Sequence, residues 1–212
     1  MRKSLKINIL ILLSAISLCA NAQKYAIQGG YVNPIRYGSN VSSTFYYGGQ
    51  IGGTVNFDLK NNMSLLTGAL YNFVYANKIQ GYPSTTSVTY KTYGHFLDIP
   101  VHFMYSIPLF KNVKIFGYAG PNINIGLSQK QETISTLTYP ETNPLYIPND
   151  KKDLYTNSIL NRFNLQIGTG GGVQWKKYQI KSGYNFGILN LDKVNTTNQY
   201  QNGWFVSFVY EF

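Results

Sequence analysis

The sequence predicts an all-β protein: an up-and-down, antiparallel transmembrane β-barrel of eight strands, preceded by a cleaved signal peptide. Apolar residues recur at every second position in eight segments, and short and long polar connections alternate between these segments. The last segment carries an unbroken apolar face up to Phe212. A period of two puts successive side chains on opposite faces of a strand. Lipid requires such strands to close on themselves, with the apolar face outward.

The first 22 residues have the pattern of a secretory signal peptide. A basic segment, residues 2–6, precedes an apolar run over residues 7–18, and Ala20-Asn21-Ala22 supplies the small residues of a cleavage site. The apolar run is too short for a permanent transmembrane anchor. We predict cleavage after Ala22, which leaves residues 23–212 as the barrel domain.

Composition excludes several kinds of site. Cys19 is the single cysteine, so the barrel domain has no disulfide, thiolate metal site or cysteine nucleophile. Cys19 leaves lipidation open, although Leu18 stands where a lipoprotein signal has a small residue. The leader removes three of the 18 basic residues, so 15 basic and eight acidic residues give a net charge of +7. These charges are scattered, which argues against a nucleic-acid partner.

The first four strands follow from alternation between an apolar face and a polar or small one. They are predicted over residues 24–33, 45–59, 63–76 and 94–106. In the second strand, Tyr47, Ile51 and Val55 lie on one face, whereas Gln50 and Thr54 lie on the other. The polar turn after this strand is short, and the polar connection that follows the third strand is long.

The last four strands repeat this pattern. They are predicted over residues 113–127, 162–175, 178–189 and 203–212. Residues 107–112 and 176–177 form short turns, whereas residues 128–161 and 190–202 form long connections. Tight periplasmic turns and extended external loops alternate in this way in outer-membrane barrels, and an even number of strands puts both termini on the periplasmic side.

A soluble lipocalin-like barrel is the main alternative fold, because it also has eight antiparallel strands. Its apolar side chains would face an internal ligand cavity, and its outer surface would be polar. In this sequence the apolar face is the aromatic-rich one, and the opposite face carries Asn, Gln, Gly, Lys and Asp. That pattern favours an apolar exterior and hence the membrane.

The chain resembles the outer-membrane β-barrel domain proteins of Bacteroidetes, which include PorT-type and OmpX-like barrels. The resemblance is carried by the segments Phe96–Val101, Gly117–Pro121, Ile167–Val173, Tyr184–Leu191 and Tyr210–Phe212. PorT-type members imply a link to type IX protein secretion. The resemblance also implies that the barrel-assembly machinery reads the outer face of the last strand, namely Trp204, Val206, Phe208, Tyr210 and Phe212.

The predicted lumen is narrow. An eight-stranded barrel has an interior just wide enough for its own side chains. Inward glycines make room, but Leu70, Met104, Phe116 and Tyr118 lie on the same face and refill it. A narrow porin-like channel is therefore an alternative to a closed barrel.

Several ionisable side chains are predicted to face this lumen. An unpaired buried charge costs several kcal/mol, so they are expected to pair with one another and with lumen Asn and Gln. Such a network would fix the register of the strands, and the alternative is ion conduction or proton-linked gating. The predicted network comprises Asp58, Asp98, His102, Lys114, Arg162, Lys181 and Glu211.

The two histidines do not form a paired metal site, because a separation of seven residues puts His95 and His102 on opposite faces of one strand. We predict no metal, no cofactor and no catalytic residues. A lipid-modifying enzyme is the remaining alternative. It would place His95 near the external rim, beside Ser84, Thr85 and Ser87 of the adjoining connection.

Three further features concern scaffold and surface. Pro100 inside a strand removes a donor and suggests a bulge or local widening. Aromatic residues near strand ends are predicted to form interface belts. The connection 128–161 has the composition of a recognition surface or of a disordered loop. The predicted belt residues are Tyr25, Tyr47, Tyr75, Tyr105, Trp175 and Trp204.

We therefore expect a monomeric barrel in the outer membrane of a Gram-negative bacterium, in contact with lipid and lipopolysaccharide. Its expected role is non-enzymatic: structural, surface-recognition or accessory to secretion. A surface or secretion partner is expected to bind through the connection 128–161.

Overall fold

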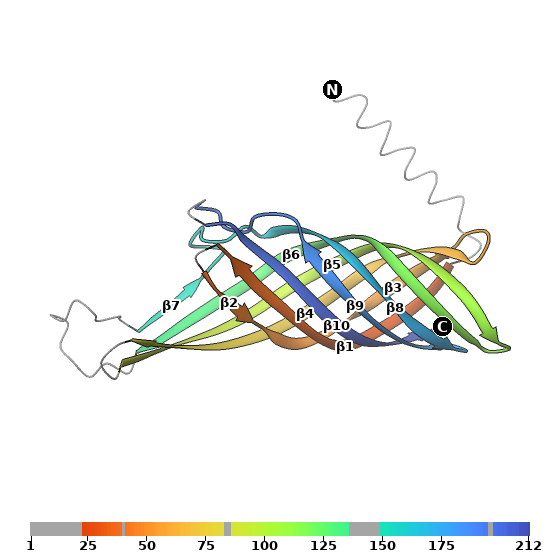
Figure 1. Cartoon of the computed structure of the whole chain (residues 1–212), viewed down its shortest axis with the longest axis horizontal. Helices are drawn as coiled ribbons and strands as arrows, with labels where there is room; N and C mark the ends of the chain where they lie inside the picture. Colours follow the sequence, from red (N-terminus) through yellow and green to blue (C-terminus); the bar gives the residue numbers. More distant parts are fainter. Residues whose placement is uncertain (1–22, 40, 83–85, 136–148, 195–196) are drawn as a thin grey trace, which may run out of the picture.

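The barrel closes into a ring of eight strands in a computed structural model (Figure 1). The structure describes residues 23–39, 41–82, 86–135, 149–194 and 197–212, so the predicted signal peptide lies outside the described residues. The ring strands are β1 (Gln23–Gly38), β3 (Tyr47–Asp58), β4 (Met63–Tyr82), β5 (Thr86–Phe110), β6 (Val113–Ser135), β8 (Phe163–Trp175), β9 (Tyr178–Gly187) and β10 (Gln199–Glu211). Two short strands, β2 (Val41–Phe45) and β7 (Asp150–Asp153), add to β1 and β6 at one end.

Closure depends on the pairing of the first strand with the last. β1 and β10 are antiparallel from Ala26–Glu211 to Gly38–Gln199. Each other ring strand pairs antiparallel with its neighbours, so the topology is up-and-down, as predicted. The start of β1 and the end of β10 therefore lie at the same end of the barrel, which is also the end with the short turns. Within the described residues no helix is long and apolar enough to cross a membrane.

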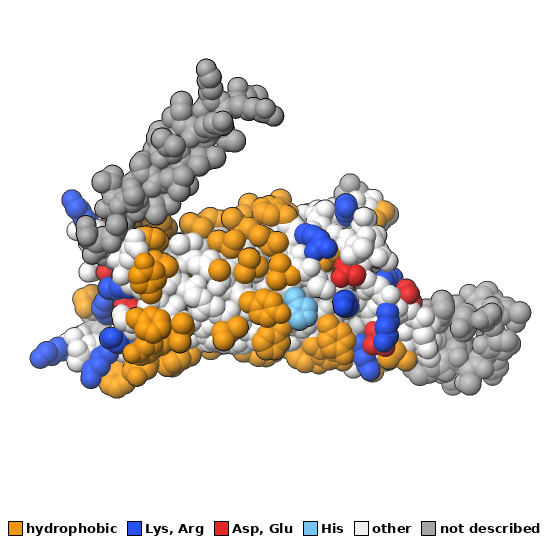
Figure 2. All heavy atoms as spheres, turned by 180° about the vertical axis from the view of Figure 1, so that it is seen from behind, with side chains coloured by type: hydrophobic (Ala, Val, Ile, Leu, Met, Phe, Trp, Pro, Cys, Tyr) orange, Lys and Arg blue, Asp and Glu red, His pale blue; other side chains and the backbone are white. Residues whose placement is uncertain are grey.

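The apolar face points outward, which confirms the membrane pattern and contradicts a lipocalin-like interior. Ile51, Ile180 and Phe208 on the outer wall are 62%, 61% and 52% exposed. The inward Gln28 and Asn164 are only 2% and 1% exposed. Figure 2 shows hydrophobic side chains over the body of the barrel and charged side chains gathered towards its two ends. The barrel thus has a polar interior and an apolar wall.

Aromatic side chains mark both edges of the apolar wall. At the loop end, the rings of Tyr47, Tyr75 and Tyr93 form a row across three strands, with centroid distances of 5.4 and 5.0 Å. At the turn end, Trp175 stacks on Tyr178 at 6.1 Å. Such rows are typical of the two membrane–water interfaces, where amphipathic aromatic rings are enriched.

Strands β4, β5 and β6 continue well beyond the predicted boundaries. Residues 77–82 and 86–93, expected as part of a loop, form the paired ends of β4 and β5, with Asn77 opposite Lys91. β6 continues to Ser135 and pairs with β7. In Figure 1 these strands project past the rest of the barrel. The prediction was wrong here because neither face of these segments meets lipid, so the apolar alternation disappears while the backbone pairing persists.

The turn between β5 and β6 is shorter than predicted. β5 runs to Phe110 and β6 starts at Val113, so the predicted turn 107–112 contracts to Lys111-Asn112. Pro100 causes no bulge, because β5 pairs with β4 in the same register before and after it. Asp98 lies opposite Leu70, and Val101 lies opposite Thr67. The ladder to β4 is only interrupted there, as expected for a residue without an N–H group.

A row of glycines in β8 makes room for rings from the next two strands on one side of it, β6 and β5. Gly168, Gly170 and Gly172 face the rings of His102, Tyr118 and Phe116, which come from β5 and β6. A Cβ atom at any of the three glycines would overlap the facing side chain. The glycines thus make room for the rings that fill the lumen, as the sequence suggested.

We predict that Gly170→Ala lowers the free energy of unfolding by about 1–3 kcal/mol, because overpacking forces side chains off their rotamers. The added methyl group would overlap the Tyr118 hydroxyl and the Ser182 carbonyl oxygen. Gly117→Ala is the matched control, since its Cβ would meet no neighbour closer than 3.8 Å. Urea titration of both variants in lipid vesicles measures the difference, and equal stability would contradict this account of the packing.

Candidate functional site

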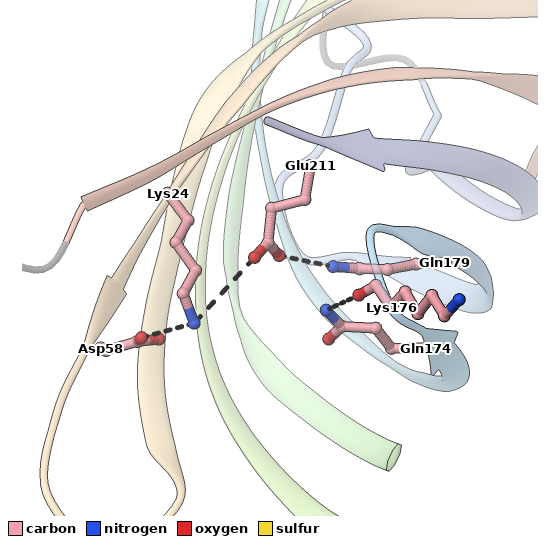
Figure 3. A network of polar contacts seen from close by, with 6 residues as sticks. All are labelled: Lys24, Asp58, Gln174, Lys176, Gln179 and Glu211. Atoms are coloured by element: carbon pink, nitrogen blue, oxygen red, sulfur yellow. Dashed lines mark hydrogen bonds and ion pairs between the residues drawn. The ribbon is translucent and has the colours of Figure 1, made fainter. Parts of the chain in front are cut away.

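A polar network closes the turn end of the lumen (Figure 3). Lys24 Nζ lies 2.6 Å from Asp58 Oδ2 and 4.0 Å from Glu211 Oε1, and Gln179 donates to Glu211 Oε2 at 3.1 Å. These contacts join β1, β3, β9 and β10 across the seam where the barrel closes. Lys24 and Asp58 are 38% exposed, so their ion pair contributes little stability and serves mainly to occupy the mouth.

Lys114 lies at this mouth and not in the network. It is exposed and lines a recess of about 220 Å³ together with Lys24, Asp58 and Glu211. Lys24, which the sequence analysis did not name as a lumen charge, takes the pairing role expected of Lys114. The alternation of β1 puts Lys24 on the inner face and Tyr25 on the outer face, and this signal could have identified Lys24.

Above the mouth, an aromatic stack crosses the lumen. His102 stacks on Tyr118 with centroids 5.0 Å apart and an interplanar angle of 18°, and Lys181 Nζ lies 5.8 Å from the centre of the Tyr118 ring. His102 and Lys181 are each 4% exposed. Within the described residues the Lys181 ammonium group has no carboxylate partner. The prediction that Lys181 pairs with a lumen carboxylate is therefore wrong. Lys181 makes a cation–π contact with the Tyr118 ring instead.

A belt of amides surrounds Asp98 in the middle of the lumen. Asn72 and Asn124 donate to its two carboxylate oxygens at 2.9 and 2.6 Å. Asn72 accepts a hydrogen bond from Gln50 at 2.9 Å, and Gln50 accepts one from Gln28 at 2.7 Å. The belt thus runs through five neighbouring strands, from β1 to β6. Asp98 is satisfied by neutral donors and not by an ion pair.

The belt continues towards the loop end through Arg36. Arg36 Nη2 donates to Gln129 Oε1 at 2.9 Å and to Gln201 Oε1 at 3.1 Å, and its guanidinium group lies 5.4 Å from the centre of the Tyr46 ring. Arg36 is 8% exposed. The sequence analysis missed it because the first strand was predicted to end at Asn33, although the inward alternation runs on through Pro34 to Arg36.

The middle of the lumen is filled. The cavity enclosed by the amide belt has a volume of about 30 Å³, room for one or two water molecules. At the loop end, residues 154–160 form a turn after β7, the closing turn. Its Leu154, Tyr155 and Leu160 are buried and pack in the same apolar cluster as Tyr46 and Leu191. The barrel interior therefore has a packed middle, with a recess of about 220 Å³ at the turn end and one of about 270 Å³ at the loop end.

Arg162 lies outside the lumen, so its predicted place in the network is wrong. Its Nη1 donates to the carbonyl oxygens of Gly126 and Leu127 at 3.2 and 2.7 Å, and its guanidinium group lies 4.9 Å from the centre of the Tyr155 ring. The register of β6 shifts by one residue at Leu127. This bulge and the start of β8 at Phe163 end the alternation that predicted an inward side chain.

The two histidines are separated by the barrel wall. His95 is on the outer face, where its Nδ1 lies 2.6 Å from the Tyr71 hydroxyl and the two rings stack. Ser84 and Thr85 lie outside the described residues, and the side chain of Ser87 is not described either. Within the described part of the chain, no group of three or more His, Cys, Asp or Glu residues could hold a metal ion.

Part of the connection 128–161 forms strands: β6 continues to Ser135, and β7 pairs with it. Asp153 at the end of β7 accepts hydrogen bonds from the amides of Tyr155 and Thr156 at 2.9 and 3.1 Å and from the Ser128 hydroxyl at 3.2 Å. Partial burial tends to raise the pKa of Asp153, but these hydrogen bonds and the nearby Arg162 charge outweigh it and lower that pKa. Residues 136–148 lie outside the described residues.

The predicted assembly signal lies on the outer face of β10. Trp204, Val206, Phe208 and Phe212 are exposed, and the Tyr210 ring lies 5.4 Å from that of Phe212. The strand is therefore accessible along its apolar face, and its role in assembly stays a prediction.

We predict that Asp98→Leu lowers the free energy of unfolding by about 2–5 kcal/mol, because the amide groups of Asn72 and Asn124 lose their acceptors inside the lumen. Asp98→Asn, of nearly the same shape, keeps one acceptor oxygen and should cost about 1 kcal/mol. Equilibrium unfolding in vesicles compares the two variants. An Asp98→Leu variant as stable as Asp98→Asn would show that the belt does not depend on the carboxylate.

The solved structures that resemble this barrel are outer-membrane barrels of low sequence identity. Neisserial surface protein A shares 12% identity over 89% of this chain and 97% of its own, with a TM-score of 0.45. The attachment invasion locus protein Ail of Yersinia pestis shares 12% over 90% of this chain and 99% of its own, with a TM-score of 0.40. The outer membrane enzyme PagL shares 10% over 89% of this chain and 99% of its own, with a TM-score of 0.38.

The family assignment comes from the sequence. Among curated proteins none matches this chain. Residues 17–208 match the family described as "Outer membrane protein beta-barrel domain", nearly the full length. With its closed ring of strands and apolar outer wall, the chain belongs to the outer membrane protein beta-barrel domain family and resides in the outer membrane.

Proposed function

We propose that this protein is a non-conducting, non-enzymatic barrel that presents its projecting strands to a partner at the cell surface. The observation that carries this proposal is the contrast between a packed lumen and three strands, β4, β5 and β6, of 20, 25 and 23 residues. β8 and β9 have only 13 and 10 residues. The extra length lies above the apolar wall, where it serves no purpose in spanning the bilayer.

The proposal orients the barrel with its long connections outside the cell and both termini in the periplasm. The short turns, at Lys111-Asn112 and Lys176-Lys177, support this orientation, because periplasmic turns of outer-membrane barrels are short. The projecting strands would then stand on the external side. A surface-recognition role follows from this placement, and the resemblance to PorT-type barrels supports a role in protein secretion as its alternative.

We expect the full-length protein to show no conductance above background in planar bilayers, because the amide belt and the aromatic stack leave no aqueous path of useful width. Single-channel recording tests this expectation. Discrete steps whose size changes in a Lys181→Met variant would make the lumen a narrow channel. Lys111→Met, at the exposed turn, is the control for the loss of one positive charge.

We expect a partner to co-purify with the full-length protein in mild detergent and to be lost when the β6–β7 extension is removed. Lys130 and Asp153 are opposite each other, so residues 131–152 can be replaced by a two-residue Asn-Gly turn that leaves the closing turn and Arg162 in place. The matched control replaces residues 78–90 by the same turn between Asn77 and Lys91.

Affinity purification from outer membranes, with mass spectrometry of the eluates, compares the three proteins. A partner retained by the control and lost from the β6–β7 variant supports recognition through this extension. A partner retained by both variants, or none with the full-length protein, contradicts it. A change of membrane lipid composition that depends on His95 would point instead to a lipid-modifying enzyme.

A further inference from the structure

A groove opens in the barrel wall where the strands differ in height. β8 begins at Phe163 and β9 ends at Gly187, whereas the neighbouring β6 continues to Ser135. The closing turn after β7 and the segment that follows β9 border the space above these short strands. The groove has a volume of about 560 Å³. It lies on the wall, just above the lipid-facing surface, and not in the lumen.

The groove is cationic above and apolar below. Arg162 and Lys193 line it and are both exposed, and no acidic side chain is among its described lining residues. Phe163 and Leu189 form its lower part, and Phe163 is 52% exposed. The outer wall beneath continues with Phe186 and Ile188, which are 48% and 47% exposed. The groove is thus continuous with the surface that faces the acyl chains.

The two cations are held in place by neutral groups. Both hydrogen bonds of Arg162 to the bulge carbonyls use Nη1, and the Tyr155 ring supports the guanidinium plane. Among the described residues, Nη2 and Nε of Arg162 have no acceptor. Lys193 Nζ lies 3.3 Å from the Ser158 hydroxyl oxygen. Two carboxylates lie nearby, and both already accept hydrogen bonds. Asp153 accepts from two backbone amides and a hydroxyl, and Asp192 accepts from the amides of Val194 and Thr197 and from the Thr197 hydroxyl.

We propose that Arg162 and Lys193 bind the phosphorylated headgroup of an anionic outer-leaflet lipid, whose acyl chains lie along Phe163, Phe186 and Ile188. A pre-positioned guanidinium group and a flexible ammonium group suit phosphate oxygens, and basic pockets at the level of the headgroups recognise anionic lipids in this way. The choice of outer-leaflet lipid rests on the orientation proposed above. Lipid A, a phosphorylated saccharolipid, is the corresponding probe.

The test measures binding of lipid A to the folded full-length protein in neutral detergent micelles by native mass spectrometry. We expect Arg162→Gln/Lys193→Gln to weaken binding by about tenfold, because charge-assisted hydrogen bonds to phosphate are lost. Lys193→Gln alone should weaken it by about fivefold, and it leaves the contacts of Arg162 with the closing turn intact. Lys111→Gln/Lys177→Gln removes the same charge at the opposite end and should leave binding unchanged.

Three results would overturn the proposal. Dephosphorylated lipid A could bind as tightly as lipid A, the control could lose as much affinity as the groove variant, or inorganic phosphate could compete as strongly as the lipid, which would indicate a site for free anions. The assay in micelles is independent of membrane orientation. A failure of lipid binding therefore leaves the proposed function standing, whereas labelling of the projecting strands on intact cells tests the orientation by itself.

Discussion

The structure depends on one constraint: every backbone N–H and C=O group within the bilayer needs a partner inside the protein. The pairing of β1 with β10 meets this constraint by removing the last free edge. Once the ring is closed, alternate side chains must face either lipid or a lumen too narrow for much water. The apolar wall and the polar core of this protein both follow from that division.

The core shows how a polar interior can be packed without many ion pairs. Asp98 is held by amides, and Lys181 and His102 lie against the Tyr118 ring. Amide side chains can donate and accept at once, so Gln28, Gln50 and Asn72 each donate to the next residue in a belt that ends at Asp98. Glycines in β8 leave space for the rings from β5 and β6. Amide side chains and aromatic rings together therefore fill the middle of the lumen.

The ring could be predicted from the sequence because lipid imposes a strict apolar alternation on each spanning strand. The projecting parts of β4, β5 and β6 could not, since their outer face carries polar residues such as Asn77, Lys91 and Lys130 and the apolar alternation that marks a spanning strand is absent there. Arg36 was missed because the first strand was predicted to end at Asn33, and Arg162 was misplaced because a bulge opposite His95 ends the alternation. A local backbone irregularity, which side-chain patterns do not reveal, thus decided where Arg162 lies.

The unequal height of the wall connects the fold with both proposals. The tall side, β4 to β6 with β7, offers backbone and side chains well away from the membrane. The low side, β8 and β9, leaves Arg162 and Lys193 at the level of the lipid headgroups. A macromolecular partner would meet the tall side first, while a lipid could reach the low side by diffusion in the membrane plane. The closing turn contacts Arg162 and also follows β7, so it is the segment that joins the two surfaces.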